Sequence, residues 1–419
     1  MQLCIFEDDR YGDLEPLSLY RPTFELVCGK NTLREKILRS YPGVKYSLHC
    51  RTYLAPLQEI LNPGIEINKI SDDECLFING SIIASKDLSN IIPLNNSDKL
   101  YLNGDRIIAA HVSGKNLKEL KSRLNVPIDK RLFSGLPVEL VEVKTAQYIW
   151  DLIYQNGKEL ISDFEFYSSL NKNRISGKIS DGVHFVEKEN IIIEEGAQIK
   201  PGVVIDASEG PVFIGKNSII FPNAVIEGPA YIGESSLIKS CSTIYKNVSI
   251  GKLCKIGGEV ENLVFLPYSN KQHAGYLGHS YIGSWVNIGA DTNCSDLKNN
   301  YGSIKVKLNG TTVDTGLQFL GLIMGDHSKT AINTMFNTGT IAGFSCNIFG
   351  SGFPAKYIPS FSWGGSDDLI TYEADKSIVT AKKVMERRLK KMSDAEENIF
   401  KFIFSVTEKE RTNKGFNIG

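Results

Sequence analysis

The chain has 419 residues, of which 42% are hydrophobic, so it is long enough for two or three domains with sizeable cores. Its 47 basic and 48 acidic residues leave a net charge of −1, which gives no overall field that would attract nucleic acid or an anionic membrane. The sequence contains no run of about 18 apolar residues that could span a bilayer. Composition therefore indicates a multidomain globular protein that binds neither nucleic acid nor membrane.

The N-terminus and the cysteines indicate the cellular compartment. The first ten residues have neither a basic start nor a long apolar stretch, so we expect no signal peptide. The eight cysteines form no C-x-x-C pair and no metal-ligand spacing. We therefore expect reduced thiols in a cytoplasmic protein.

Residues 1–165 alternate strand-like with helix-like segments, which predicts a small α/β domain. Strands are expected at 3–6, 74–80 and 99–105. A helix is expected to begin after Asn31 as its N-cap, and a helical connection is expected between about 145 and 180. Ligands of such a domain bind at the carboxyl ends of its strands.

Isoleucine recurs every six residues in the second half of the chain. The series comprises Ile214, Ile220, Ile226, Ile232, Ile238, Ile244, Ile250 and Ile256. Three earlier residues, Ile193, Ile199 and Ile205, share this phase after one shift near Pro211. An apolar period of six is typical of a left-handed parallel β-helix, in which each hexapeptide forms one side of a coil. The alternative, a sandwich of short strands, has no such fixed period. We expect the β-helix over residues 166–360.

The repeats share a form in which Ile-Gly is followed by three residues, as in Ile214-Gly215, Ile232-Gly233 and Ile250-Gly251. We expect the isoleucine to point inward and the glycine to accept a corner conformation that a Cβ would oppose. A small residue two positions before the next isoleucine would fit the narrow interior. Residues 361–419 are rich in lysine and glutamate and predict a C-terminal α-helix, roughly 369–410, with one apolar face packed on the rest.

The isoleucine phase is lost after Ile256 and returns at Ile282 and Ile288. Between them lie two of the six histidines, with a lysine, an asparagine and two tyrosines. A break in a regular solenoid usually marks a binding loop. We therefore expect the chemistry of the β-helix in this segment.

Motifs in and after this segment carry a family resemblance. The pattern His273-x-x-Tyr276-Leu277-Gly278, followed by Ile282-Gly283 and Asn287-Ile288-Gly289-Ala290, resembles the acetyltransferase motif of bifunctional UDP-N-acetylglucosamine pyrophosphorylase / glucosamine-1-phosphate N-acetyltransferases. Tyr20-Arg21-Pro22 and Thr32-Leu33-Arg34-Glu35-Lys36 are similar to a branch of that family with a shorter N-terminal domain. The resemblance covers nearly the whole chain.

The resemblance implies acetyl transfer from acetyl-CoA to an amino-sugar 1-phosphate such as glucosamine 1-phosphate, with His273 as general base. A neutral imidazole is suited to taking the ammonium proton near pH 7. The alternative for His273 is an exposed loop histidine. His279 is expected to be structural, or to support a neighbouring residue of the site. The residues implied to hold the sugar phosphate are Tyr276, Asn287, Lys271, Glu261, Asn300 and Tyr301. Those implied to contact coenzyme A are Ala290, Ala331, Lys329 and Phe349.

The segment before His273 departs from the family. The family places basic residues there for the sugar phosphate, whereas residues 258–263 contain Glu261 and no lysine. Lys271 or Lys329 could supply the positive charge. The alternative for both lysines is a solvated surface position.

The resemblance also implies that the N-terminal domain transfers a uridylyl group to N-acetylglucosamine 1-phosphate with Mg²⁺. The family's glycine-rich phosphate loop is absent, and Ser81 stands where the family has a metal-binding aspartate. The remaining candidates to bind the nucleotide are Arg10, Arg21, Arg34 and Lys36, and those to bind Mg²⁺ are Asp8, Asp9 and Asp105. The alternative for Arg21 and Arg34 is structural pairing with residues such as Glu25 and Glu35.

Three functions remain open on the sequence alone. The first is a two-site enzyme, with nucleotidyl transfer in the first domain and acetyl transfer in the β-helix. The second is an acyltransferase with a silent or regulatory first domain, and the third is a non-enzymatic scaffold that senses sugar nucleotides. We expect a homotrimer, because threefold symmetry would let a neighbouring β-helix complete each site.

Overall fold

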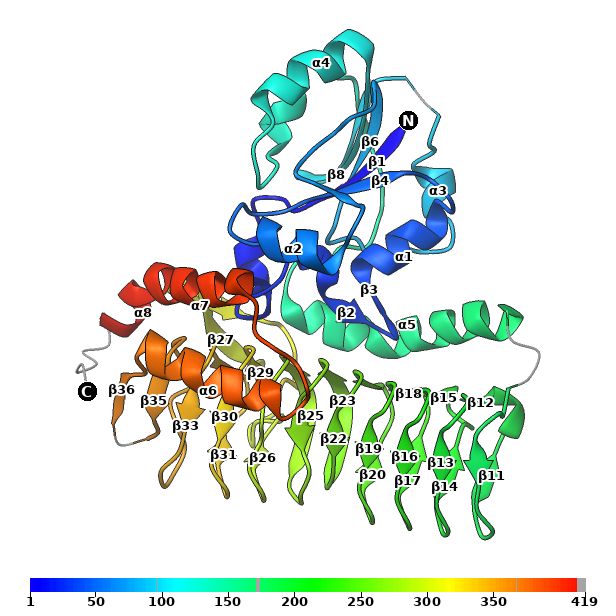
Figure 1. Ribbon diagram of the computed structural model, residues 1–419, viewed down its shortest axis with the longest axis vertical. Coiled ribbons are helices and arrows are strands. Elements are labelled where there is room, and N and C mark those ends of the chain that lie inside the picture. The colour runs from blue at the N-terminus through cyan, green and yellow to red at the C-terminus, as the bar shows by residue number, and fades with distance from the viewer. Residues whose placement is uncertain (96, 171–173, 367, 413–419) are drawn as a thin grey trace.

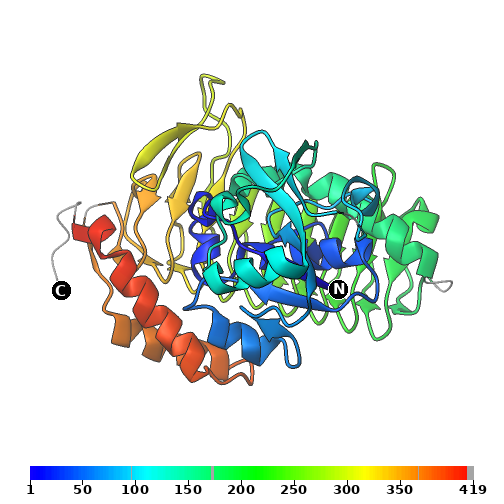
Figure 2. The same ribbon diagram turned by 90° about the horizontal axis from the view of Figure 1, so that it is seen from above.

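The computed structural model describes residues 1–95, 97–170, 174–366 and 368–412 (Figure 1). An α/β domain lies above a long β-helix, and helix α5 (Ile149–Leu170) runs between them. Helices at the C-terminal end pack beside the last coils (Figure 2). This arrangement confirms the predicted fold class. None of the described helices has both the length and the apolar character that crossing a bilayer would require.

The first domain is built on a seven-stranded mixed sheet in the order β5-β4-β1-β6-β8-β7-β9. Its strands are β1 (Gln2–Phe6), β4 (Tyr46–His49), β5 (Glu66–Ile67), β6 (Glu74–Asn79), β7 (Lys99–Asn103), β8 (Arg106–Ser113) and β9 (Val138–Leu140). Strands β2 (Val27–Cys28) and β3 (Asn31–Thr32) form a separate hairpin. The helices are α1 (Leu33–Ser40), α2 (Ala55–Leu61), α3 (Leu88–Ile91) and α4 (Gly114–Arg123). Short 3₁₀ turns are η1 (Tyr11–Leu14), η2 (Leu17–Leu19), η3 (Thr23–Glu25), η4 (Lys130–Phe133) and, before the β-helix, η5 (Lys188–Asn190).

The β-helix has three faces of parallel strands. Face 1 contains β10 (Lys178–Ile179), β13 (Gln198–Ile199), β16 (Ile219–Ile220), β19 (Leu237–Ile238), β22 (Lys255–Ile256), β24 (Asn270–Lys271), β30 (Lys329–Thr330), β33 (Asn347–Ile348) and β35 (Ser362–Gly364), with β36 (Leu369–Thr371) added antiparallel. Face 2 contains β11 (His184–Val186), β14 (Val204–Asp206), β17 (Val225–Glu227), β20 (Thr243–Ile244), β26 (Asn293–Cys294) and β31 (Met335–Phe336). Face 3 contains β12 (Ile191–Ile193), β15 (Val212–Ile214), β18 (Ala230–Ile232), β21 (Val248–Ile250), β29 (Leu322–Met324), β32 (Thr340–Ala342) and β34 (Tyr357–Ile358). Strands β23 (Glu259–Phe265) and β25 (Tyr276–Ile282) bend from face 2 onto face 3.

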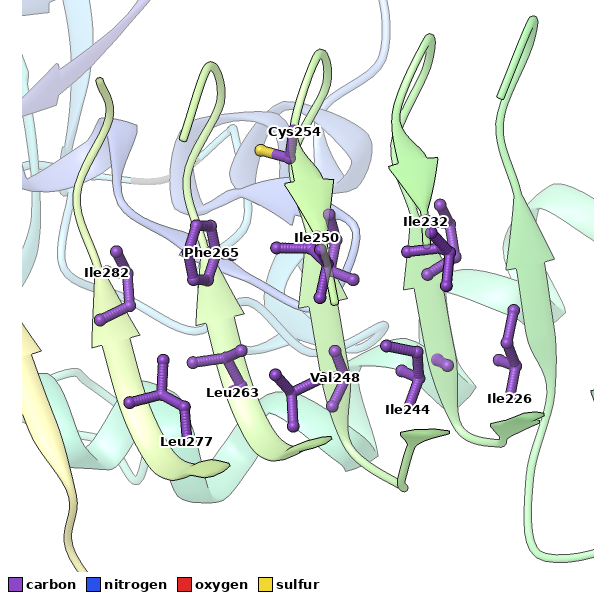
Figure 3. Packing of buried hydrophobic residues seen from close by; sticks show 14 of the residues in the cluster. Ile226, Ile232, Ile244, Val248, Ile250, Cys254, Leu263, Phe265, Leu277 and Ile282 are labelled. Carbon is purple, nitrogen blue, oxygen red and sulfur yellow. The ribbon is translucent and has the colours of Figure 1, made fainter. Parts of the chain in front are cut away.

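The predicted isoleucines form the inner ladder. Ile220 lies opposite Ile238, three hexapeptides further along the chain, and Ile238 lies opposite Ile256. All eight isoleucines of the series are fully buried, and Figure 3 shows several of them stacked from coil to coil. Ile199 lies opposite Ile220 of the next coil. The coil between them contains extra residues, which explains the shift of the isoleucine period near Pro211. The small residues Ser218, Ser236 and Cys254 are fully buried in the interior, as predicted.

The repeat glycines do not adopt the corner conformation that was predicted for them, and glycine is needed there for a different reason. The left-handed corner residues are Asn217, Ser235 and Leu253, and the Ile-Gly glycines do not have positive φ angles. A Cβ on Gly233 would instead lie 2.5 Å from the backbone carbon of Gly251 in the next coil. Glycine is required there because successive coils approach closely, and not because of the backbone conformation.

The break in the isoleucine phase is not a large loop, which corrects the prediction. Phe265 lies opposite Ile250 in one coil and opposite Ile282 in the next, so the stack continues through the segment. Because the corners of these coils are shorter, fewer than 18 residues separate one inward-pointing residue from the next. The strands of neighbouring coils nevertheless stay in register. Val260, Phe265 and Lys271 occupy inward positions there in place of isoleucine.

The C-terminal segment forms three helices where one was expected: α6 (Ala374–Glu386), α7 (Asp394–Val406) and α8 (Glu408–Thr412). The chain turns after α6, where Leu389 is left-handed with a φ of 55°. Helix α7 begins with a capping box in which Ser393 bonds the backbone N–H of Glu396 and the Glu396 side chain returns to Ser393. Residues 413–419 of the predicted segment lie outside the described residues.

One aromatic cluster joins the three parts of the molecule. Phe344 and Phe361 of the β-helix contact Phe400 of α7, with ring centroids 4.7 Å and 6.4 Å apart. Tyr20 of the first domain packs 5.4 Å from Phe344. Because these residues share one buried core, the first domain, the β-helix and the C-terminal helices are held as a unit.

Candidate active site

His273 lies exposed on the edge of the β-helix between faces 1 and 2. The backbone N–H of Asp291 donates to the carbonyl oxygen of Ala274 at 3.0 Å, and the N–H of Asn333 donates to that of Ala290 at 2.8 Å. The residues that follow His273 are therefore stacked beneath Ala290 and the residues around Asn333 on the same edge. We call this row of corner residues the His273 edge.

Three of the four residues expected to contact coenzyme A, Ala290, Ala331 and Phe349, lie on the His273 edge, whereas Lys329 lies on face 1 in strand β30. The N–H of Ala331, two residues before Asn333, donates to the carbonyl oxygen of Ile348 at 2.8 Å. Phe349 follows Ile348 and is 38% exposed, with its ring 5.6 Å from that of Trp363. An apolar ring and small side chains thus line the edge over several successive coils.

Lys271 points into the β-helix. It is therefore neither a phosphate contact nor a solvated surface residue, the two alternatives that the sequence left open. It lies opposite Ile256 in the inner ladder and is 1% exposed. Its ammonium donates to the carbonyl oxygens of Gly257 at 3.0 Å, His273 at 3.2 Å and, by a shorter contact, Gly275. Burial lowers the pKa of Lys271 to about 8. Its side chain is committed to holding the turn that carries His273.

Tyr276 belongs to a small acidic cluster on face 2. Its hydroxyl donates to the carboxylates of Asp296 at 3.0 Å and Glu261 at 3.4 Å. Burial and these two carboxylates raise the pKa of the Tyr276 phenol. The same Asp296 oxygen lies 2.8 Å from Nδ1 of His279, whose ring stacks on Phe319 at 5.1 Å. His279 is accordingly a structural histidine, as expected, while Asp296 was not predicted.

Asn300 and Tyr301 lie apart from these residues, on an arm inserted between face 2 and face 3. The arm carries the hairpin β27 (Lys305–Leu308) and β28 (Thr311–Asp314), which projects from the β-helix in Figure 2. Tyr301 is 67% exposed, and Asn300 accepts a hydrogen bond from the N–H of Gly302. Within the described residues, neither side chain contacts the His273 edge, so their substrate role stays a prediction that this placement does not favour.

A cleft of about 330 Å³ lies on face 1 beneath the end of α6, and we call it the face-1 cleft. Its lining comprises Lys255, Tyr268, Asn270, Gln272, Trp285, Val286, Asn287, Lys329, Val384, Arg387 and Arg388. Asn270 pairs with Asn287, and Asn287 with Lys329, so these residues form one column up the face. The predicted residues Asn287 and Lys329 are therefore neighbours in a polar cleft.

A second cleft, of about 540 Å³, lies between the first domain, the β-helix and the C-terminal helices. Arg21 and Arg34 both line this interdomain cleft, together with Lys252 and the stacked rings of Tyr268 and Trp285. The two rings are 4.2 Å apart and nearly parallel, at 8°. Because the same two rings line the face-1 cleft, the two clefts adjoin along them.

Arg21 and Arg34 are both engaged in ion pairs, but only Arg34 has a partner of the kind that the structural alternative expected. Arg21 pairs with the buried Asp326 of the β-helix. Arg34 pairs with Glu25 at 3.0 Å. Their nucleotide-binding role stays a prediction, since both also line the interdomain cleft.

The other two predicted cations lie elsewhere. Lys36 is buried in α1 and pairs with Glu159 and Asp163 of α5, each at 2.8 Å. Arg10 pairs with Asp105 at 2.5 Å. Lys36 thus fixes α5 against the first domain, and the structure does not bring it together with Arg10.

Two internal ion pairs lie at the carboxyl end of β1, with partners that follow β4 and begin β8. Glu7 pairs with Arg51 at 2.9 Å, and Asp8 pairs with Arg106 at 2.9 Å, all four side chains being buried. Asp105 is paired with Arg10 and largely exposed. In the described part of the chain, no three His, Cys, Asp or Glu side chains are grouped as metal ligands. Asp8 and Asp105 are thus each paired with an arginine, and the role of these carboxylates and of the exposed Asp9 in binding Mg²⁺ stays a prediction.

Family comparisons match both halves of the chain. Residues 3–172 match the family model described as sugar nucleotidyl transferase. Residues 211–246 match the model described as bacterial transferase hexapeptide (six repeats). The first match covers the α/β domain with α5, and the second lies within the isoleucine ladder.

Curated relatives are named as bifunctional proteins, and one of the names gives two activities. A bifunctional sugar-1-phosphate nucleotidylyltransferase/acetyltransferase of Sulfurisphaera tokodaii is 31% identical over 48% of this chain and 43% of its own length. Bifunctional protein GlmU of Methanococcus aeolicus is 28% identical over 75% of this chain and 76% of its own. Bifunctional protein GlmU of Wigglesworthia glossinidia brevipalpis is 25% identical over 81% and 71%. The chain thus spans less than half of the first relative and about three quarters of the other two.

Among solved structures, a UDP-N-acetylglucosamine acyltransferase from Campylobacter jejuni matches 54% of this chain and 94% of its own, with 12% identity and a TM-score of 0.31. The chain therefore joins a domain of the sugar nucleotidyl transferase family to hexapeptide repeats of the bacterial transferase type.

Proposed function

We propose that the β-helix transfers an acetyl group from acetyl-CoA to the amine of an amino-sugar 1-phosphate such as glucosamine 1-phosphate. The observation that carries this proposal is the His273 edge, where the exposed His273 belongs to the same row of corner residues as Ala290, Ala331 and Phe349. The names of the bifunctional relatives support it independently of the geometry.

His273 would act as the general base of this reaction. The amine must lose its ammonium proton before its lone pair can form the C–N bond, and the C–S bond then breaks to release the thiol of coenzyme A. Acetyl-CoA supplies the activated acyl group, so the protein has to orient the amine and accept its proton. The hydrogen bond from Lys271 to the carbonyl oxygen of His273 would hold the backbone of this turn, and with it the imidazole, in a fixed position.

Tyr276 and Asn287 would bind the sugar phosphate on the two sides of the His273 edge. Tyr276 lies on face 2 with its hydroxyl already oriented by Asp296. Asn287 lies on face 1 in the cleft that contains Lys329. The edge itself is exposed, so we propose that a second subunit closes it in a homotrimer.

We further propose that the first domain transfers a uridylyl group to N-acetylglucosamine 1-phosphate. The match of residues 3–172 to the nucleotidyl transferase family supports this activity. The interdomain cleft supports it too, because it combines Arg21 and Arg34 with an aromatic pair on which a base could stack.

One observation favours the alternative of a silent first domain. The charges at the carboxyl end of β1 are neutralised internally by the Glu7–Arg51 and Asp8–Arg106 pairs. These cations are therefore not free to bind nucleotide phosphates. The two proposals for the first domain have to be separated by experiment.

A product screen on the full-length protein tests both proposals. Acetyl-CoA is incubated with glucosamine 1-phosphate, and free thiol and N-acetylated product are measured. In parallel, uridine and thymidine triphosphates are incubated with N-acetylglucosamine 1-phosphate and Mg²⁺, and pyrophosphate is measured. Acetylated product without pyrophosphate would indicate a silent first domain. If no amino-sugar phosphate is acetylated, the acetyltransferase proposal fails.

A further inference from the structure

Four cationic side chains line the face-1 cleft, and no carboxylate does. Lys255 and Lys329 come from strands of the β-helix, and Arg387 and Arg388 come from the end of α6. Among the described residues, none of the four pairs with a carboxylate, although the whole chain has 48 acidic residues for 47 basic ones. The cleft is therefore positively charged although the chain as a whole is nearly neutral.

Two of these cations are oriented by neutral partners. Arg388 donates from Nη2 to Oδ1 of Asn270 at 2.8 Å, which fixes the guanidinium at the cleft wall. Lys329 donates to the carbonyl oxygen of His327 at 2.8 Å. Neutral acceptors leave the positive charges uncompensated, so both cations can still attract an anion.

The cations are held close enough to affect one another. Burial and the charges of Arg388 and Arg387 lower the pKa of Lys255. Burial alone lowers the pKa of Lys329 to about 8. Like charges gathered in a partly dry cleft are unfavourable, and a bound anion would remove that cost.

A purely structural explanation accounts for only half of the cluster. Cations are favourable near the C-terminus of a helix, which explains why Arg387 and Arg388 follow the last turn of α6. It does not explain Lys255 and Lys329, because these residues come from β-strands on the opposite wall of the cleft. Two elements distant in sequence thus present cations to the same cleft.

The size and the neutral groups of the cleft suit a phosphate. Its volume of about 330 Å³ is that of a site for a small ligand. Asn287 and Gln272 add amide groups that can donate hydrogen bonds. Guanidinium groups bind phosphate oxygens in forked pairs, which gives direction as well as charge.

We propose that the face-1 cleft binds the phosphate of a substrate, with Arg387 and Arg388 of α6 and Lys255 and Lys329 of the β-helix as its ligands. The inference rests on the proposed acetyl transfer and extends it to the anchoring of the substrate. Gln272 lines the cleft, and the next residue is His273, so a molecule anchored there by its phosphate would reach the His273 edge. The phosphate could belong to the sugar 1-phosphate or to coenzyme A.

Calorimetry on the full-length protein tests the site without relying on activity. Glucosamine 1-phosphate, coenzyme A and inorganic pyrophosphate are titrated into the wild type and into the double variant Arg387→Gln/Arg388→Gln. We expect the double variant to bind one of the two substrates, and pyrophosphate, at least about 10-fold more weakly, because two charge-assisted contacts are lost. Lys383→Gln is the matched control, since Lys383 is an exposed cation of α6 outside the cleft.

The outcomes distinguish the source of the phosphate and the failure of each proposal. Weakened binding of glucosamine 1-phosphate alone assigns the site to the acceptor, and weakened binding of coenzyme A alone assigns it to the donor. Lys255→Gln, on the opposite wall, should weaken the same ligand with the melting temperature unchanged. Affinities equal to wild type in both cleft variants would overturn the site. Phosphate binding that depends on Arg387 and Arg388, with no acetylation of any substrate, would overturn only the proposed reaction.

Discussion

Arg21 and Asp326 form an ion pair that joins the first domain to the β-helix. The Asp326 carboxylate is fully buried and also accepts a hydrogen bond from the N–H of Ser284 at 2.7 Å. Arg21 reaches it across the wall of the interdomain cleft. A guanidinium that was predicted to bind nucleotide therefore contributes to holding the first domain over the β-helix.

Replacing Arg21 by alanine should destabilise the protein by about 3–5 kcal/mol, because the buried Asp326 carboxylate loses its partner. Urea unfolding followed by fluorescence measures the change. The double variant Arg21→Ala/Asp326→Asn should recover part of the loss, since it no longer leaves a buried charge. Unchanged stability with loss of nucleotide binding would instead show that Arg21 acts on the ligand.

His273→Ala should lower the rate of acetyl transfer by roughly 10²–10⁴-fold, the usual loss when a positioned base is removed. The fold should persist, because His273 is exposed and lies outside the inner ladder. His184→Ala is the control, since His184 is an exposed histidine of face 2 in the first coils. A rate close to that of the wild type would remove His273 from the mechanism.

Lys271→Met should reduce kcat of acetyl transfer by roughly 10–100-fold through the position of the His273 turn. Methionine can fill the inner ladder above Ile256, but it cannot donate to the carbonyl oxygens of Gly257, His273 and Gly275. Because Lys271 touches no substrate in this mechanism, KM should change far less than kcat. A change in KM alone would argue against a positioning role.

Two buried histidines should make the protein sensitive to acid. Burial lowers the pKa of His49 to about 4 and that of His327 well below its ordinary value. Both must be neutral in the folded state, so the stability they contribute is complete above about pH 6.5 and is lost as pH falls towards 4. For His49 alone this loss approaches about 3 kcal/mol, at about 1.4 kcal/mol for each pH unit.

His327→Phe tests this explanation. His327 packs among aromatic rings, including Phe400 at 4.8 Å, and neither of its ring nitrogens has a hydrogen-bond partner among the residues that the structure describes. A phenyl ring fits that environment and cannot be protonated, so the free energy of unfolding should fall less steeply between pH 6.5 and 4. An unchanged slope in urea titrations at several pH values would exclude His327 as a cause.

The protein should be a homotrimer, because the His273 edge of one chain is open and a neighbouring β-helix could close it. Size-exclusion chromatography with light scattering at micromolar concentration measures the assembly. A monomer with full acetyltransferase activity would contradict this prediction.

The sequence predicted the β-helix because the isoleucine period is set by the geometry of the coil itself. It misjudged the break after Ile256, since a shortened corner shifts the phase in the sequence but not in space. Lys271 was assigned to the surface because buried lysines are rare. The carbonyl groups that compensate its charge come from turns that no pattern in the sequence reveals.

Residues of the site that depend on tertiary contacts could not be found in the sequence. The partners Arg21 and Asp326 are separated by 305 positions, and no sequence pattern around either residue indicates that they pair. The arginines at the end of α6 read as part of a charged helix, and only the packing of α6 on face 1 places them beside Asn287. Local signals were better: the helix start predicted at Asn31 is one residue from its true cap, Thr32.

The shared aromatic cluster has a consequence for how the two halves could be separated. Cutting the chain after α5 would leave Tyr20 on one fragment and Phe344 on the other. Each ring would then be exposed, because it packs against the other in the intact chain. Removing α7 would uncover the same surface by taking away Phe400. Neither half is therefore a detachable module, and we expect fragments of this chain to aggregate where the halves of a loosely linked fusion would stay in solution.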